Sequence, residues 1–199
     1  MKVLLTAFDP FGGESVNPAA EAIQRVPVSI ADIEVITFEV PTVFRESVKV
    51  VMRAIQRVHP DVVLCIGQAG GRSDIAVERV AINLDDASIT DNAGNQPKDT
   101  MIALDGPAAI FATIPVKKLV QAIRDRGIPA SVSNSAGTFV CNHLFYGVLN
   151  RCAKEFPGIR VGFIHVPFLP SQVIARTAAS SMSLEVIVQA IEAAIGALA

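Results

Sequence analysis

Three cysteines, Cys65, Cys141 and Cys152, are the strongest nucleophiles that the sequence offers. Cys141 follows SNSAGTFV, where a predicted strand turns sharply through positions 136–137 into a predicted helix. A cysteine in the first turn of a helix lies at the positive end of the helix dipole, which favours the nucleophilic thiolate. Cys65 lies inside an apolar strand and Cys152 deep within the helix, so we expect both to be packed and inert. Cys141 is therefore the candidate nucleophile, with a third inert thiol as the alternative.

A nucleophilic thiol needs a base, and the chain has three histidines. His59 ends a predicted helix and is expected to be exposed. His143 is two residues after Cys141, about 200° away around the helix, so the two side chains cannot face each other. His165 ends an apolar strand, where it is either a hydrogen-bonded core histidine or the partner of Cys141.

Glu78 is a carboxylate inside the otherwise apolar segment IAVERVAIN, residues 75–83. A buried carboxylate is costly unless it is paired, and a catalytic imidazole needs a group that fixes its tautomer and orientation. We therefore expect Glu78 to orient His165. Two alternatives stay open: a salt bridge to Arg79, although neighbouring strand residues point to opposite faces, or an outward position on an edge strand.

The aromatic, glycine-rich segment FDPFGGESVNP, residues 8–18, directly follows the first predicted strand. It matches neither G-x-G-x-x-G nor the P-loop pattern, so it does not indicate a nucleotide phosphate site. Phe8 and Phe11 could hold a small flat ring between them, or they could be core residues that close the end of the sheet. Asn17 before Pro18 predicts the N-cap of a helix.

Predicted strands alternate with predicted helices along the whole chain. The strands are expected at 2–7, 33–40, 61–67, 75–83, 130–135 and 160–168, and the helices at 18–25, 44–59, 115–127, 138–156 and 184–198. This alternation predicts a single α/β domain, residues 1–199, with a mostly parallel central sheet and helices on both faces. The polar segment 84–106 is expected to be a loop or flap. Functional residues should collect beyond the carboxyl ends of the strands.

The composition excludes several classes of function. Seventeen basic and nineteen acidic residues give a net charge of −2 without a basic run, so no nucleic-acid partner is expected. No apolar run reaches the roughly 18 residues of a membrane span, and the first apolar stretch resembles a strand rather than a signal peptide. Few cysteines without metal-ligand spacing indicate free thiols, no metal site and a cytoplasmic location. The mean hydropathy of +0.45 favours a homo-oligomer.

Four segments resemble the pyroglutamyl peptidase I family of cysteine peptidases, also called pyrrolidone-carboxylate peptidases. They are FDPFGGESVNP (8–18), GQAGGRSDIAVERVAIN (67–83), SNSAGTFVCNHLFYG (133–147) and GFIHVPFLP (162–170). The segments are long, occur in the family's order and extend over nearly the whole chain.

This resemblance implies a cysteine exopeptidase that removes an N-terminal pyroglutamyl residue from peptides through a thioacyl-enzyme, without a metal or organic cofactor. It implies that Cys141 is the nucleophile, His165 the base and Glu78 the orienting carboxylate. It also implies a substrate pocket lined by Phe8, Phe11, Gln68, Phe139 and Val140, with Asn17 nearby. Tetramers are usual in the family, so a homotetramer is the expected assembly.

The sequence departs from the family pattern at two positions. Ala76 replaces a Ser or Thr two residues before the glutamate, and Ser88 replaces an arginine associated with the oxyanion site. Arg72 and Lys98, in flanking loops, are the cations that could replace that arginine. Ser88 leaves open a second function, a pyroglutamyl-peptide binder with impaired catalysis. The α/β architecture alone leaves open a third, a different enzyme such as a nucleoside phosphorylase, for which Cys141 would be dispensable.

Overall fold

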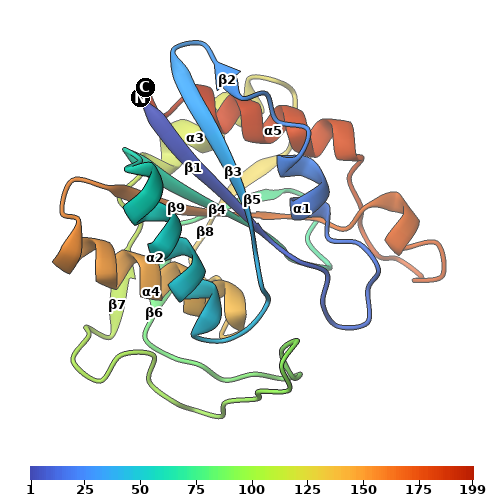
Figure 1. The fold of residues 1–199 in the computed structure, drawn as a ribbon. Helices are drawn as coiled ribbons and strands as arrows, with labels where there is room; N and C mark the ends of the chain where they lie inside the picture. Colours follow the sequence, from blue (N-terminus) through green and yellow to red (C-terminus); the bar gives the residue numbers. More distant parts are fainter.

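A seven-stranded sheet forms the centre of the protein, whose computed structural model describes residues 1–199 (Figure 1). The strands follow the order β2-β3-β1-β4-β9-β5-β8. Their bounds are β1 (Lys2–Phe8), β2 (Ser29–Ile30), β3 (Ile33–Val40), β4 (Val62–Gln68), β5 (Ile75–Glu78), β8 (Ala130–Ser133) and β9 (Arg160–Val166). Four of the six strand pairings are parallel, since only β2–β3 and β5–β9 are antiparallel. The predicted α/β fold with a mostly parallel sheet is confirmed.

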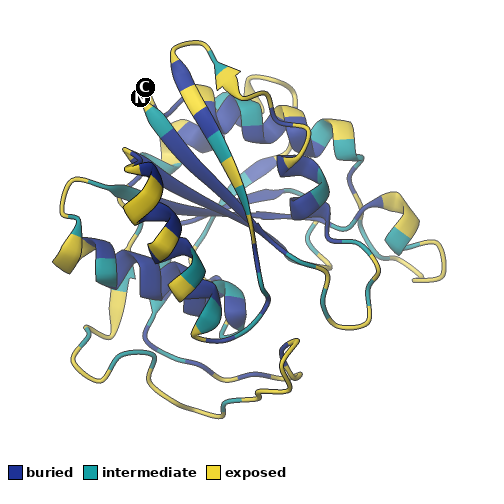
Figure 2. Cartoon of the chain, in the orientation of Figure 1, coloured by how far each residue is buried: buried dark blue, intermediate teal, exposed yellow.

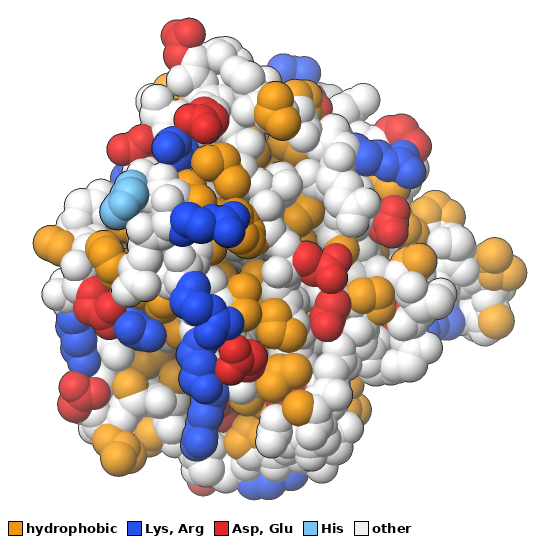
Figure 3. Space-filling model, viewed as in Figure 1, with side chains coloured by type: hydrophobic (Ala, Val, Ile, Leu, Met, Phe, Trp, Pro, Cys, Tyr) orange, Lys and Arg blue, Asp and Glu red, His pale blue; other side chains and the backbone are white.

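Helices cover both faces of this sheet. They are α1 (Pro18–Ile23), α2 (Glu46–Val58), α3 (Val116–Arg124), α4 (Val140–Glu155) and α5 (Leu184–Gly196), and a short 3₁₀ helix spans Pro170–Gln172. In Figure 1, α1, α3 and α5 lie on one face, and α2 and α4 lie on the other. The central strands between them are buried except at the first residues of β1 and β9, whereas the helices expose their outer sides (Figure 2). On the visible surface, several Lys and Arg side chains form a stripe near the centre, with acidic side chains beside it (Figure 3).

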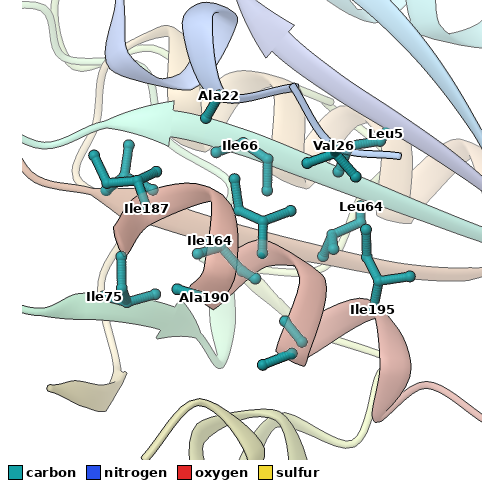
Figure 4. Close-up of a cluster of buried hydrophobic side chains, with 14 of the residues drawn as sticks. Leu5, Ala22, Val26, Leu64, Ile66, Ile75, Ile164, Ile187, Ala190 and Ile195 are labelled. Atoms are coloured by element: carbon teal, nitrogen blue, oxygen red, sulfur yellow. The ribbon is translucent and has the colours of Figure 1, made fainter. Parts of the chain in front are cut away.

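Alternation along the central strands decides which side chains reach each face. Ile66 of β4 and Ile164 of β9 point toward Ile187 and Ile195 of α5 (Figure 4). Successive residues of a strand point to opposite faces. Their neighbours in sequence therefore point to the face covered by α2 and α4, and His165 is one of them.

The expected strand 75–83 is wrong in extent. It is two strands, β5 and β6 (Val80–Ile82), and β6 leaves the main sheet to pair with β7 (Ala109–Phe111). Arg79 makes the transition: its N–H donates to Ser133 O, and its carbonyl accepts from Ala112 N. β5 itself runs antiparallel to β9, a long-range pairing that the local pattern does not encode. The short elements β2, β7 and the 3₁₀ helix were not expected at all.

Segment 84–106 contains no helix and only an isolated bridge between Asp85 and Thr100, as expected of a loop. Helix α2 begins two residues later than expected, because two side chains bind the backbone in front of it. Asp91 accepts a hydrogen bond from Phe44 N, and His143 Nε2 accepts one from Arg45 N. These contacts hold Arg45 at a φ of +63°, a conformation that the helix cannot include.

The structure contains no helix long and apolar enough to cross a membrane.

Candidate active site

Cys141 is the second residue of α4, at the place where the sequence predicted it. The N-cap Phe139 provides no side-chain cap, and the backbone N–H groups of Val140, Cys141 and Asn142 donate to no backbone acceptor. Such orphan donors at a helix start can receive a developing negative charge. Cys141 is partly exposed, whereas Cys65 and Cys152 are buried, as expected for inert thiols.

The surroundings of the Cys141 sulfur oppose the thiolate that the helix start was expected to favour. Burial raises the pKa of Cys141 to about 12, and the negative charge of Glu78 raises it further in the same direction. Desolvation disfavours a charged thiolate more than the helix dipole favours it. A nucleophile at this position must therefore lose its proton during the reaction.

His165 and Glu78 form a buried pair, with Nδ1 of the imidazole 2.8 Å from Oε1 of the carboxylate. Ala76 lies opposite His165 in the β5–β9 pairing, and Glu78 lies opposite Phe163, so Glu78 and His165 are diagonal neighbours on one face. Because a carboxylate only accepts, the shared proton resides on Nδ1, and Nε2 is the basic nitrogen.

Gly67 brings the sulfur and the imidazole to the same place. It pairs with His165 across the parallel β4–β9 ladder, so the two positions face the same side of the sheet. A Cβ added to Gly67 would lie 3.1 Å from Cys141 Sγ and 2.8 Å from the Phe163 ring. The sulfur therefore packs against the bare backbone of β4, one strand away from His165. The sequence analysis missed Gly67, whose signal was a glycine closing an apolar strand.

The cation that accompanies Glu78 is Arg72 and not its neighbour Arg79. Arg72 Nη2 lies 3.4 Å from Glu78 Oε1, and the same nitrogen donates to Ser133 Oγ and Ser135 O at 3.3 and 3.2 Å. Arg79 forms no ion pair. The other carboxylate oxygen, Oε2 of Glu78, is buried without a partner in the protein.

The aromatic residues expected in a substrate pocket separate into two groups. The rings of Phe11 and Phe139 are partly exposed, and their centroids are 6.0 Å apart. Phe44, which the sequence analysis missed, contacts Phe139 edge-on at 5.4 Å. Phe8 and Val140 are almost completely buried within the core beneath α2 and α4. The alternative of a core residue thus fits Phe8, while Phe11 and Phe139 remain accessible.

Asn17 and Gln68 have different surroundings. Asn17 is the N-cap of α1, as predicted: its Oδ1 accepts from Ala19 N, and its Nδ2 donates to Asp9 O. Both ends of this amide are thus used within the protein. Gln68, the last residue of β4, receives a hydrogen bond at Oε1 from Gln172 Nε2 at 3.0 Å.

Ser88 is exposed in segment 84–106, and side chains of the same segment hold its backbone. Gln96 Nε2 donates to the carbonyls of Ala87 and Ser88, and Lys98 Nζ donates to the carbonyl of Ala87. Of the two cations considered as replacements for the missing arginine, Lys98 is therefore next to Ser88. Arg72 is instead engaged with Glu78.

A second histidine–carboxylate pair lies on the same helix turn. His143 Nδ1 is 2.8 Å from Asp85 Oδ2, and its Nε2 accepts the N–H of Arg45, so both ring nitrogens are occupied. His143 therefore has no free nitrogen for Cys141, in agreement with its position around the helix. No cluster of three or more His, Cys, Asp or Glu side chains is positioned to hold a metal ion.

A cysteine at a helix start, beside a buried imidazole–carboxylate pair on an α/β sheet, is the arrangement of a cysteine-type hydrolase. The chain belongs to the pyroglutamyl peptidase family, whose model matches residues 1–199. It is 54% identical over 198 residues to the pyrrolidone-carboxylate peptidase of Clostridium perfringens, covering 100% of this chain and 93% of that protein. It is 56% identical over 195 residues to pyrrolidone-carboxylate peptidase 1 of Caldanaerobacter subterraneus, covering 98% and 96%.

Solved structures agree with this assignment. Pyroglutamyl peptidase I from Bacillus amyloliquefaciens superposes with a TM-score of 0.95 at 48% identity, over 99% of this chain and 94% of that one. A mutant pyrrolidone carboxyl peptidase from Pyrococcus furiosus gives 0.94 at 39% identity, over 100% and 98%. The protein is thus a hydrolase of this family.

Proposed function

We propose that the protein is a cysteine exopeptidase that hydrolyses the amide bond after an N-terminal pyroglutamyl residue of peptides, with Cys141, His165 and Glu78 as its catalytic residues. The observation that carries this proposal is the placement of Cys141 Sγ against Gly67, the strand partner of His165, while His165 is held by Glu78. Family membership supports the choice of bond.

The reaction begins with a neutral thiol. As the sulfur attacks the pyroglutamyl carbonyl carbon, Nε2 of His165 takes the thiol proton and the carbonyl becomes an oxyanion. Glu78 accepts from Nδ1 throughout and stabilises the imidazolium that forms. The free N–H groups at the start of α4 receive the oxyanion. The N–H of Ala69, next to Gln68, is unsuitable for this role because it donates to Val166 O.

The second half of the reaction returns the enzyme to its resting state. His165 gives its proton to the leaving amine as the C–N bond breaks, which leaves a thioester on Cys141. Water then attacks the thioester carbonyl, with His165 accepting its proton. The C–S bond breaks, the thiol regains a proton, and free pyroglutamate leaves.

Specificity for the lactam follows from the aromatic surroundings of the site. Phe11 and Phe139 offer two partly exposed rings, and a flat, uncharged five-membered ring can pack against such groups without losing the hydration of an ammonium. A free N-terminal amine would carry that cost.

We also propose that the protein is a cytoplasmic homotetramer. The grounds are its free thiols, its high mean hydropathy and its family membership.

Turnover of pyroglutamyl p-nitroanilide tests the proposal. Wild-type protein should release nitroaniline, Cys141→Ser and His165→Ala should abolish this release, and Cys65→Ala should preserve it. Mass spectrometry of a quenched reaction should find the acyl group on Cys141. Unchanged turnover in Cys141→Ser, or a reaction that requires phosphate, would overturn the proposal.

The replacement of arginine by Ser88 motivates a second candidate, a pyroglutamyl-peptide binder with impaired catalysis. Losing an oxyanion donor typically costs about 10²–10³ in rate. If Ser88 impairs the enzyme, Ser88→Arg should raise kcat by that order. If Lys98 supplies the missing charge instead, Ser88→Arg should change kcat little, whereas Lys98→Met should lower it. Peptide binding without acylation of Cys141 would favour the binder.

A further inference from the structure

Gln172 is the centre of a hydrogen-bond network that the proposed chemistry does not explain. It ends the 3₁₀ helix that follows β9, and its Oε1 accepts from Leu169 N at 2.9 Å. Its Nε2 donates to Gln68 Oε1 at 3.0 Å and to Glu14 Oε2 at 3.2 Å, and it approaches Val16 O at 3.4 Å. A backbone N–H on one side and a carboxylate on the other leave only one orientation for this amide.

The fixed amide of Gln172 determines the polarity of Gln68. Because Gln172 donates, the atom of Gln68 that faces it must be the carbonyl oxygen Oε1. Nε2 of Gln68 makes no hydrogen bond in the protein, yet it is not among the fully buried polar atoms that lack partners. The accessible end of Gln68 is thus a donor, at the end of β4 and next to Gly67, against which Cys141 Sγ packs.

We propose that Gln172 is a specificity-positioning residue, which locks the carboxamide of Gln68 so that it presents N–H donors to the carbonyl of a bound lactam. This inference rests on the proposed function. The ring carbonyl is the acceptor that distinguishes pyroglutamate from proline. A Gln68 amide that turned freely would offer an acceptor half of the time, and an acceptor repels that carbonyl.

The surroundings of Gln172 supply a matched control. Arg176 pairs with Glu14 Oε1, and its guanidinium lies 4.6 Å from the centre of the Phe168 ring. Arg176→Met removes these contacts between the 168–176 segment and the 8–18 loop without replacing Gln172 or any of its hydrogen-bond partners. The Arg176→Met variant therefore shows how a general loosening of the 168–176 segment affects substrate preference.

The test compares Q172A, Q172E and R176M with wild type on pyroglutamyl and prolyl p-nitroanilide. Loss of one well-placed hydrogen bond corresponds to roughly a tenfold change, so Q172A should raise KM for the pyroglutamyl substrate about tenfold with kcat within threefold. The ratio of kcat/KM for the pyroglutamyl substrate to kcat/KM for the prolyl substrate should fall by a similar factor. Q172E turns the Gln68 amide around, because a carboxylate only accepts, and should lower the preference further than Q172A. R176M should leave it unchanged.

Binding of 2-pyrrolidinone, followed by thermal shift, gives a second measurement that needs no turnover. Wild type and R176M should be stabilised by this lactam, and Q172E should not. An unchanged preference in Q172A and Q172E, or equal losses in R176M, would overturn the role of Gln172 while leaving the peptidase intact. A wild type that binds the lactam but does not cleave the anilide would overturn the proposed function alone. A wild type that does neither would overturn both.

Discussion

Arg72 Nη2 lies 3.4 Å from Glu78 Oε1, the same oxygen that receives the hydrogen bond of His165 Nδ1. One buried carboxylate oxygen is thus shared by a guanidinium and an imidazole. The charge of Glu78 raises the pKa of the Cys141 thiol, so a cation next to Glu78 lowers the cost of forming the thiolate. Arg72 therefore acts on the sulfur through Glu78.

Replacing Arg72 should reduce the catalytic rate but not abolish it. Arg72→Met leaves the charge of Glu78 uncompensated, so kcat/KM should fall about tenfold, which corresponds to about 1.4 kcal/mol. Arg72→Lys should restore most of the activity. Arg79→Met, which removes an arginine without an ion pair, is the control, and an equal loss there would refute a specific role for Arg72.

A methyl group at Gly67 should disable the nucleophile. The added Cβ of Gly67→Ala would lie 2.8 Å from the Phe163 ring and 3.1 Å from Cys141 Sγ, so the sulfur must move away from β4. Displacement of a reacting atom by about 1 Å can cost on the order of 10² in rate, and we expect a loss of that order in kcat/KM. Gly158→Ala meets no atom within 4 Å and should have wild-type kinetics. Wild-type turnover in Gly67→Ala would contradict the packing described here.

Asn142 should contribute strongly to the stability of the site. Its Oδ1 accepts from Ile82 N at 3.0 Å, and its Nδ2 donates to the carbonyls of Ile82 and Leu84 at 2.9 and 3.0 Å. Asn142→Ala leaves those three backbone groups unpaired, and the free energy of unfolding should fall by about 3 kcal/mol. Denaturant unfolding measures this loss. Asn150→Ala, on the same helix but without a side-chain hydrogen bond, should cost clearly less.

The pH dependence of alkylation should show that the resting thiol is neutral. With the pKa of Cys141 at about 12, the thiolate fraction rises roughly tenfold per pH unit across the neutral range. The rate of iodoacetamide labelling of the native enzyme should therefore increase steadily from pH 6 to about pH 9. A plateau near neutral pH would indicate a preformed thiolate–imidazolium pair instead. Peptide mapping should find the label on Cys141 before Cys65 or Cys152, which are buried.

Local patterns predicted most of the fold and the position of the reactive groups. The sharp turn before Cys141 predicted a helix start there, and Asn17–Pro18 predicted the cap of α1. The apolar run of β4 predicted a buried strand of a parallel sheet, and the apolar run of β9 predicted a strand. In each of these cases a few residues adjacent in sequence determine the conformation.

Features that depend on contacts between residues far apart in the chain could not be predicted from the sequence. The antiparallel placement of β5 puts Glu78 diagonal to His165, and no local signal specifies that neighbour. The ion pair of Arg72 and the hydrogen bonds of Gln172 likewise join segments separated by loops. The pKa of Cys141 depends on how completely the surrounding segments enclose the sulfur, which the position on the helix does not reveal.

In the first turn of α4, each of four successive residues makes a different contact. Val140 fills the core, Cys141 faces Gly67, Asn142 anchors to segment 82–84, and His143 pairs with Asp85. Insertion or deletion of a single residue before this turn would rotate all four side chains by about 100° around the helix axis. Transplanting this nucleophile to another scaffold would thus require moving the helix together with residues 82–85. In evolution, the two stretches should change in concert.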